Sequence, residues 1–123
     1  MNNILLVFLG GGIGSLLRFG IAELVKANVK SAFPLATLCS NICSCLILAV
    51  TIGFFSAKLV ENPSLRLFII VGICGGFSTF SAFSYDTVLL MRSGNLGIAI
   101  INILLSVAVC TAIIYYFTKT TTL

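Results

Sequence analysis

Two interleaved series of aromatic and hydroxyl residues are the part of this sequence best suited to chemistry. Each series recurs every three residues, and the members are Phe77, Phe80 and Phe83, then Ser78, Ser81 and Ser84. An aromatic ring has a negative face and a positive edge, so ring edges can solvate a small anion while hydroxyls donate hydrogen bonds to it. Such an anion site would need no positive charge.

The aromatic series permits two other interpretations. Phenylalanine at helical spacing is typical of a packing stripe between helices. The ring faces could also hold a cation. The spacing alone does not choose among these three uses.

Polar residues also form two stripes with helical spacing. The first stripe is spaced i, i+4, i+7 and the second every four residues, and their members are Thr37, Asn41 and Ser44, then Asn102, Ser106 and Cys110. Side chains at these spacings share one face of a helix. The two stripes could line a shared path, or they could act as hydrogen-bonding contacts between helices, worth about 0.6 kcal/mol per pair in membrane proteins.

A glycine-rich stretch precedes the hydroxyl series. Gly72, Gly75 and Gly76 each destabilise a helix by about 1 kcal/mol relative to alanine, and Ser78 and Thr79 follow at once. As a helix, residues 67–74 would rise about 12 Å, which places a break near the midplane of a membrane. Backbone groups released there must line a cavity, pack inside protein or bind an ion, because they cannot face lipid.

The composition identifies the surroundings of these residues as lipid. Of 123 residues, 59% are hydrophobic and 8% are charged, which is too few charges to coat a soluble surface. The long uncharged stretches suit helices of about 20 residues that cross a bilayer. We therefore expect an all-α membrane protein that forms a single domain over residues 1–123. Its four transmembrane helices are expected at about residues 4–25, 33–56, 65–90 and 96–117, the third one broken near the midplane.

The basic residues indicate no preferred orientation in the membrane. Four spans place both termini and the second loop on one side, and the other two loops on the opposite side. With Arg18 set aside inside the first helix, the bases on the two sides are Lys58, Arg66 and Lys119 against Lys26, Lys30 and Arg92. This tie under the positive-inside rule is either chance in a short chain, or it permits both orientations and an antiparallel homodimer.

Other classes of function find little support. The sequence has no histidine, three acidic residues and five cysteines without CxxC spacing, so neither catalysis nor a cysteine–histidine metal site is expected. The net charge of +4 is spread without a basic run, so nucleic acid is not expected as a partner. Gly10 and Gly14 form a GxxxG pattern, which lets helices approach closely.

Together, these motifs resemble those of the CrcB/Fluc family of fluoride channels, and the resemblance covers the whole chain. The matching motifs are Gly11-Gly12-x-Gly14-x-x-x-Arg18-Phe19, Thr37-Leu38-x-x-Asn41, and Gly72-x-Cys74-Gly75-Gly76-Phe77-Ser78-Thr79-Phe80-Ser81-x-Phe83-Ser84. The resemblance implies a fluoride-selective channel in the inner (plasma) membrane that exports fluoride passively and lowers its toxicity in the cytoplasm. It also implies an antiparallel, dual-topology homodimer surrounded by lipid.

The resemblance implies roles for individual residues. Phe80 and Phe83 match phenylalanines whose ring edges contact fluoride, and Asn41 matches the pore asparagine. The other residues expected along the fluoride pore are Thr37, Ser81, Ser84, Ser106 and, in a vestibule, Arg18. Gly75 and Ser78 match positions whose backbone carbonyls, from both subunits, hold a structural sodium ion at the dimer interface. Asp86 stands where the family usually has glutamate.

Two other functions compete with the channel. A small dual-topology multidrug exporter driven by protons would have a similar length and charge balance. It would need a carboxylate embedded in the membrane, for which Glu23 and Asp86 are the candidates. A structural subunit without transport of its own would use the polar stripes only as contacts between helices.

Overall fold

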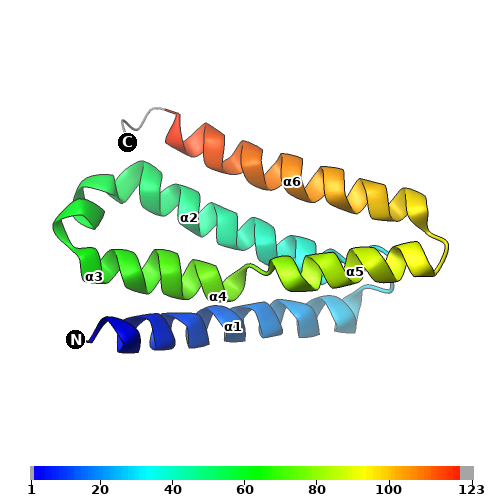
Figure 1. Ribbon diagram of the computed structural model, residues 1–123, viewed down its shortest axis with the longest axis horizontal. Coiled ribbons are helices and arrows are strands. Elements are labelled where there is room, and N and C mark those ends of the chain that lie inside the picture. The colour runs from blue at the N-terminus through cyan, green and yellow to red at the C-terminus, as the bar shows by residue number, and fades with distance from the viewer. Residues whose placement is uncertain (1, 120–123) are drawn as a thin grey trace.

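The computed structural model describes residues 2–119 as four long helical segments joined by short connections (Figure 1). They are α1 (Asn3–Asn28), α2 (Leu35–Glu61), a composite third segment, and α6 (Leu96–Thr118). The third segment runs through α3 (Pro63–Arg66), the π-helix η1 (Leu67–Cys74), α4 (Gly75–Phe77) and α5 (Phe80–Arg92). All four segments are long and apolar enough to cross a membrane. The predicted all-α fold with four such helices is confirmed.

The junction of the second and third segments follows local capping chemistry. Asn62 Oδ1 accepts a hydrogen bond from the backbone N–H of Leu65 at 3.1 Å, and Pro63 occupies the first turn of α3, where a missing N–H is tolerated. The second helix was expected to end near residue 56, whereas α2 continues to Glu61 past one non-helical residue, Phe55 (φ −123°, ψ 16°).

Four glycines bring α1 into backbone contact with the third segment. A Cβ added at Gly10 would lie 2.9 Å from Gly72 Cα, and one added at Gly14 would lie 3.0 Å from the carbonyl carbon of Gly76. Neither distance leaves room for a side chain. The close approach predicted for Gly10 and Gly14 is therefore confirmed, and Gly72 and Gly76 are the partners on the third segment.

The third segment is interrupted at Ser78 and Thr79, which are both extended (φ −78°, ψ 156° and φ −152°, ψ 116°). Thr79 caps the following helix, because its Oγ1 accepts a hydrogen bond from the backbone N–H of Ala82 at 3.2 Å. The predicted interruption is present, but the glycines are not its location. Gly72 and Gly76 lie just before it inside η1 and α4, where they serve the contact with α1.

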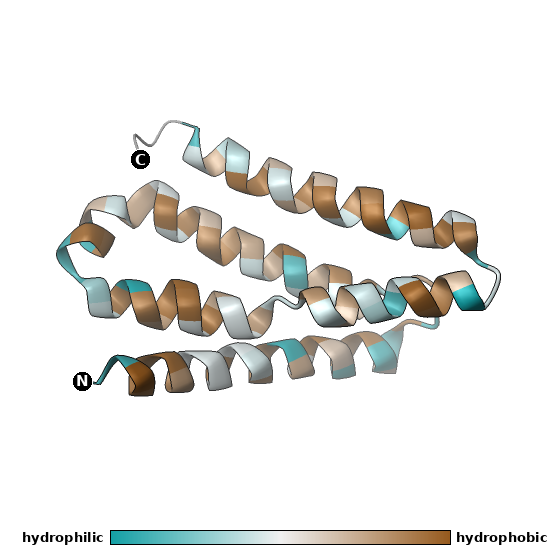
Figure 2. Ribbon diagram, viewed as in Figure 1, coloured by the Kyte–Doolittle hydropathy of each residue, from teal (hydrophilic) through white to brown (hydrophobic). Residues whose placement is uncertain are grey.

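The third segment packs against each of the other three segments. α1 packs mainly against η1 and α4, while α6 packs against α2 and α5. The start of α1, the α2–α3 junction and the end of α6 lie at one end of the molecule, and the other two connections lie at the opposite end (Figure 1). The four segments are predominantly hydrophobic along their length, with hydrophilic residues at the ends and at a few positions within the segments (Figure 2).

Candidate functional site

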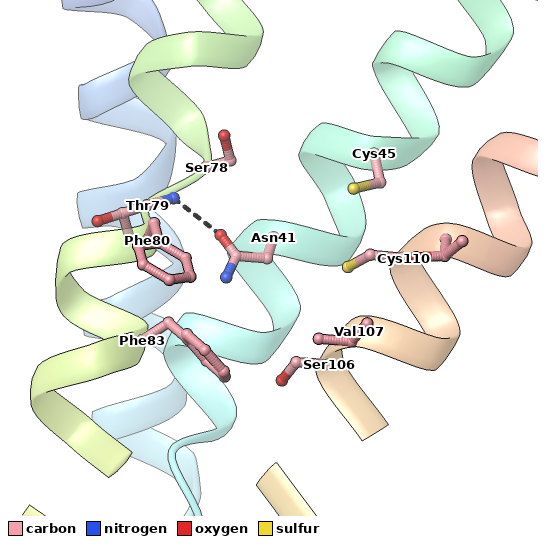
Figure 3. Close-up of a pocket in the computed structure, with 10 residues that line it drawn as sticks. Asn41, Cys45, Ser78, Thr79, Phe80, Phe83, Ser106, Val107 and Cys110 are labelled. Carbon is pink, nitrogen blue, oxygen red and sulfur yellow. Dashed lines mark hydrogen bonds between the residues drawn. The ribbon is translucent and has the colours of Figure 1, made fainter. Parts of the chain in front are cut away.

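The break in the third segment opens into a pocket between α2, α5 and α6 (Figure 3). This pocket, which we call the Phe80 pocket, encloses about 310 Å³. The residues that line it are Asn41, Cys45, Ser78, Thr79, Phe80, Phe83, Ser106, Val107, Cys110 and Thr111. Four residues expected along the fluoride pore, on three different helices, are thus brought together.

Asn41 is held in one orientation by the extended backbone at the break. Its Oδ1 accepts a hydrogen bond from the backbone N–H of Thr79 at 2.9 Å. Because an N–H can bond only to the oxygen of the carboxamide, this contact fixes which side of the group is Nδ2. The NH₂ group is directed into the pocket near the rings of Phe80 and Phe83 (Figure 3). The site therefore offers a neutral hydrogen-bond donor beside two aromatic rings.

The two rings are close neighbours but differ in exposure. Their centroids lie 5.7 Å apart with an angle of 40° between the ring planes. Phe80 is 81% exposed, whereas Phe83 is half-buried beneath it. A phenylalanine this exposed contributes little to the packing of a single chain, which weakens the packing-stripe interpretation for Phe80.

Each residue of the first polar stripe makes a hydrogen bond to a different position along the third segment. Thr37 Oγ1 donates to Asp86 Oδ2 at 2.6 Å, Asn41 bonds at the break, and Ser44 Oγ donates to the Cys74 carbonyl at 2.9 Å. The Cys74 carbonyl also accepts from the backbone and side chain of Ser78 at 3.0 Å and 2.9 Å. The stripe thus anchors the broken segment, and only Asn41 among its members lines the Phe80 pocket.

A second pocket lies on the other side of the break. This Arg18 pocket encloses about 290 Å³ and is lined by Ser15, Arg18, Phe19, Ala22, Ala36, Thr37, Ser40, Thr79 and Ala82. It collects two further residues expected along the pore, Arg18 and Thr37. Thr79 lines both pockets, so the two cavities adjoin at this residue.

The second polar stripe forms a hydrogen-bonded relay. Ser106 Oγ donates to Asn102 Oδ1 at 3.4 Å, and Asn102 Nδ2 donates to Thr87 Oγ1 at 3.0 Å. Thr87 Oγ1 in turn donates to the Phe83 carbonyl at 2.8 Å. Asn102 is fully buried, so it serves as a contact between α6 and α5. Of this stripe, Ser106 and Cys110 reach the Phe80 pocket.

Three other residues that were predicted to bind fluoride or sodium lie near the break but line neither the Phe80 pocket nor the Arg18 pocket. Ser81 is exposed, and its hydroxyl lies 3.1 Å from that of Thr79. Ser84 is half-buried one turn further along α5, and Gly75 is exposed in the last turn before the break. Sequence reasoning missed the double role of Thr79, although its place directly after a glycine-rich helical stretch is typical of an N-cap. It also missed Cys45, one turn beyond Asn41.

The motifs at this site are shared with a family of known proteins. Residues 5–117 match the family described as "CrcB-like protein, Camphor Resistance (CrcB)". The chain belongs to the CrcB family. A CrcB relative from Flavobacterium psychrophilum, named Fluoride-specific ion channel FluC, is 39% identical over 107 residues, which cover 87% of this chain and 86% of the relative.

Other CrcB relatives extend the match over nearly the whole chain. Proteins with the same name from Shewanella piezotolerans and Coxiella burnetii are 40% and 39% identical. The alignments cover 94% and 89% of this chain, and 92% and 90% of the relatives. The family resemblance expected from the motifs is confirmed, and the site described above lies within the matched region.

Proposed function

We propose that this CrcB protein is a fluoride-selective channel that lets fluoride cross the membrane passively, down its gradient. The observation that carries the proposal is the Phe80 pocket, where the NH₂ group of Asn41 faces two phenylalanine rings. Relatives that cover most of the chain are named fluoride-specific ion channels. Passage of an ion breaks no covalent bond, so the protein is a channel and not an enzyme.

Fluoride must exchange part of its hydration shell for protein groups in order to pass such a pocket. The Asn41 NH₂ group supplies hydrogen bonds, and the edges of the Phe80 and Phe83 rings supply partial positive charge. None of these groups is an ion, so each attracts the anion less strongly than a lysine or arginine would. Conduction requires this balance, because an ion that binds too tightly does not leave.

The Arg18 pocket supplies the entrance in this mechanism. A positive charge in a cleft raises the local concentration of anions, and Arg18 is the basic residue that lines this pocket. Thr79 borders both cavities, and the Ser81 hydroxyl lies beside that of Thr79. Ser81 and Ser84 then continue a series of hydroxyl donors along α5.

Two chains of opposite orientation would complete the channel. Three of the seven bases lie toward each end of the molecule, so neither orientation is favoured by the positive-inside rule. Phe80 is 81% exposed in one chain, and a second copy would enclose it. An antiparallel homodimer with a two-fold axis in the membrane plane joins the breaks of the two chains near the bilayer midplane.

The backbone at the break fits a structural sodium ion shared by the two chains. In a continuous helix the carbonyls of Gly75 and Ser78 would accept from the N–H groups of Thr79 and Ala82. Those N–H groups donate instead to Asn41 Oδ1 and to Thr79 Oγ1. The two carbonyls thereby lose the partners that a continuous helix would give them, and a hard cation prefers oxygen ligands. Gly75 and Ser78 from each chain would hold the ion and fix the dimer at its centre.

The inner membrane is the place where such a channel would protect a cell. Fluoride that accumulates in the cytoplasm would leave through it, which lowers fluoride toxicity. The competing exporter hypothesis is less well supported. It needs an embedded carboxylate free to exchange protons, whereas Glu23 is exposed near the end of α1 and Asp86 accepts a hydrogen bond from Thr37 at 2.6 Å.

Fluoride efflux from liposomes that contain only this protein tests the function. We expect efflux detected by a fluoride electrode, with little chloride efflux under the same gradient. Phe80→Ile and Phe83→Ile should each abolish it, because an aliphatic side chain has no positive edge. Phe8→Ile is the matched control, since Phe8 is similarly exposed on α1 and remote from the break. Absence of efflux by the unmodified protein would favour a structural subunit, and proton-coupled export of a cationic dye would favour the exporter.

A further inference from the structure

Two cysteines on different helices line the Phe80 pocket. Cys45 on α2 and Cys110 on α6 both line the cavity, and both sulfur atoms point to the same side, into the pocket (Figure 3). The two thiols are near enough to each other to interact electrostatically. Both are half-buried free thiols, and α2 and α6 pack directly against each other. Two neighbouring helices thus place a pair of sulfur ligands in one pocket.

We propose that Cys45 and Cys110 form a binding site for one soft, two-coordinate metal cation of the Cu⁺ or Hg²⁺ type. Soft cations select thiolate ligands, and cations of this type accept two sulfur atoms in a nearly linear arrangement. Within residues 2–119, no group of three or more cysteine and acidic side chains could hold a metal ion. Zn²⁺ prefers four ligands in a protein site, so the pair selects against it.

Binding of Hg²⁺ to this pair is balanced in protons and charge. The two S–H bonds break, two S–Hg bonds form, both protons pass to the buffer, and no electron is transferred. The product, with sulfur–mercury–sulfur bonding, is electrically neutral. A neutral product avoids the cost of placing a charge within the membrane, which favours Hg²⁺ at this depth over a cation that would leave a net charge.

A cation at this position would obstruct the Phe80 pocket, a consequence that rests on the proposed function. Cys45 follows Asn41 by one turn of α2, and Cys110 follows Ser106 by one turn of α6. A bridge between the sulfurs would also fix α2 against α6. Fluoride that passes Asn41 would meet a filled and stiffened cavity, so we expect the bound metal to inhibit efflux.

Two of the other cysteines can be replaced so that they do not compete for the metal. Cys39 and Cys43 lie one turn apart on α2, so they could bind mercury as a competing pair, although neither is among the residues that line the Phe80 pocket. Cys74 is only 5% exposed and should react slowly. The double variant Cys39→Ser/Cys43→Ser therefore keeps the proposed site and removes the competing pair.

Hg²⁺ binding to the purified full-length protein tests the site. We expect the background variant to retain one Hg²⁺ per chain against excess 2-mercaptoethanol, with Cys45 and Cys110 both protected from maleimide in intact-mass measurements. Cys45→Ser or Cys110→Ser in that background should weaken retention about a hundredfold, because the second thiol otherwise binds intramolecularly. Equal retention in either variant, or equal protection by Zn²⁺, would overturn the proposal. The corresponding alanine variants and the elution volume in detergent show whether a serine variant has failed to fold.

Fluoride efflux separates this inference from the proposed function. Hg²⁺ should inhibit efflux through the background variant by a larger fraction than through either single-serine variant, each protein being compared with its own efflux before the metal is added. Continued efflux through protein that retains the metal would refute the obstruction of the pocket. If the unmodified protein conducts no fluoride at all, the proposed function fails, whereas the mass measurements still decide whether Cys45 and Cys110 share a metal.

Discussion

The Asn41 side-chain oxygen accepts a hydrogen bond from the backbone N–H of Thr79 at 2.9 Å. This single contact connects α2 to the break in the third segment. It occupies the acceptor half of the carboxamide and leaves the donor half facing Phe80 and Phe83. It also diverts the Thr79 N–H from the carbonyl of Gly75. One hydrogen bond thereby orients the donor of the anion site and replaces a helical backbone hydrogen bond at the break.

Asn41→Asp separates the two halves of this carboxamide. Aspartate keeps an oxygen for the Thr79 N–H but replaces the NH₂ donor with a negative charge. A hydrogen bond to an ion is worth about 1.5 to 3 kcal/mol, so we expect efflux to fall at least about tenfold. Fluoride efflux and the yield of folded protein are measured together. Normal efflux would mean that Asn41 serves only to anchor the break.

Thr37 should matter chiefly through Asp86. Thr37→Val removes the donor of the 2.6 Å hydrogen bond and leaves the half-buried carboxyl group without it. We expect a loss of about 1.5 to 3 kcal/mol in stability, seen as a lower thermal midpoint in detergent. Thr37→Ser keeps the hydroxyl and is the matched control. Equal midpoints for the valine and serine variants would contradict this role.

The individual helices could be predicted from the sequence far better than the contacts between them. The spans, the close approach of Gly10 and Gly14, and the interruption before Phe80 follow from local composition and spacing. The partners of Thr37 and Ser44 do not, because they depend on how α2 is rotated and tilted against the third segment. The meeting of Cys45 and Cys110 in one pocket could not be predicted for the same reason. Dual topology and the sodium ion stay predictions.

Added charge should separate the two orientations of the chain. Ala27→Lys with Ala32→Lys adds bases at the end that already carries Lys26 and Lys30, and both alanines are exposed. Under the positive-inside rule this pair fixes one orientation. We expect the variant to conduct little fluoride when expressed alone. Reporters fused to the C-terminus measure the orientation.

The matched variant carries its added charge at the opposite end. Ala57→Lys with Ser64→Lys places two bases on exposed positions near Lys58 and Arg66. It should adopt the reverse orientation and also conduct little alone. Co-expression of the two variants should restore efflux, because an antiparallel pair can then form. Full efflux from either variant alone would exclude the antiparallel homodimer.

The glycines of α1 should differ sharply in their tolerance of alanine. Gly14→Ala places a methyl group against the backbone of Gly76, and such overpacking typically costs about 1 to 3 kcal/mol. Gly12 has open space at the same position, so Gly12→Ala should be neutral or stabilising by about 0.5 to 1 kcal/mol. Thermal unfolding in detergent compares the two. Equal effects would show that α1 does not rest on the third segment in this way.

The backbone contact between α1 and η1 has a consequence for any survey of loss-of-function variants. Substitutions at Gly10, Gly14, Gly72 or Gly76 would reduce the amount of assembled protein, although none of these residues lines the Phe80 pocket. Substitutions at Asn41 would leave assembled protein that fails to conduct. Fluoride sensitivity of cells alone would merge these two groups. The ratio of fluoride flux to the amount of protein in the membrane would separate them, because only substitutions along the path of the ion lower that ratio.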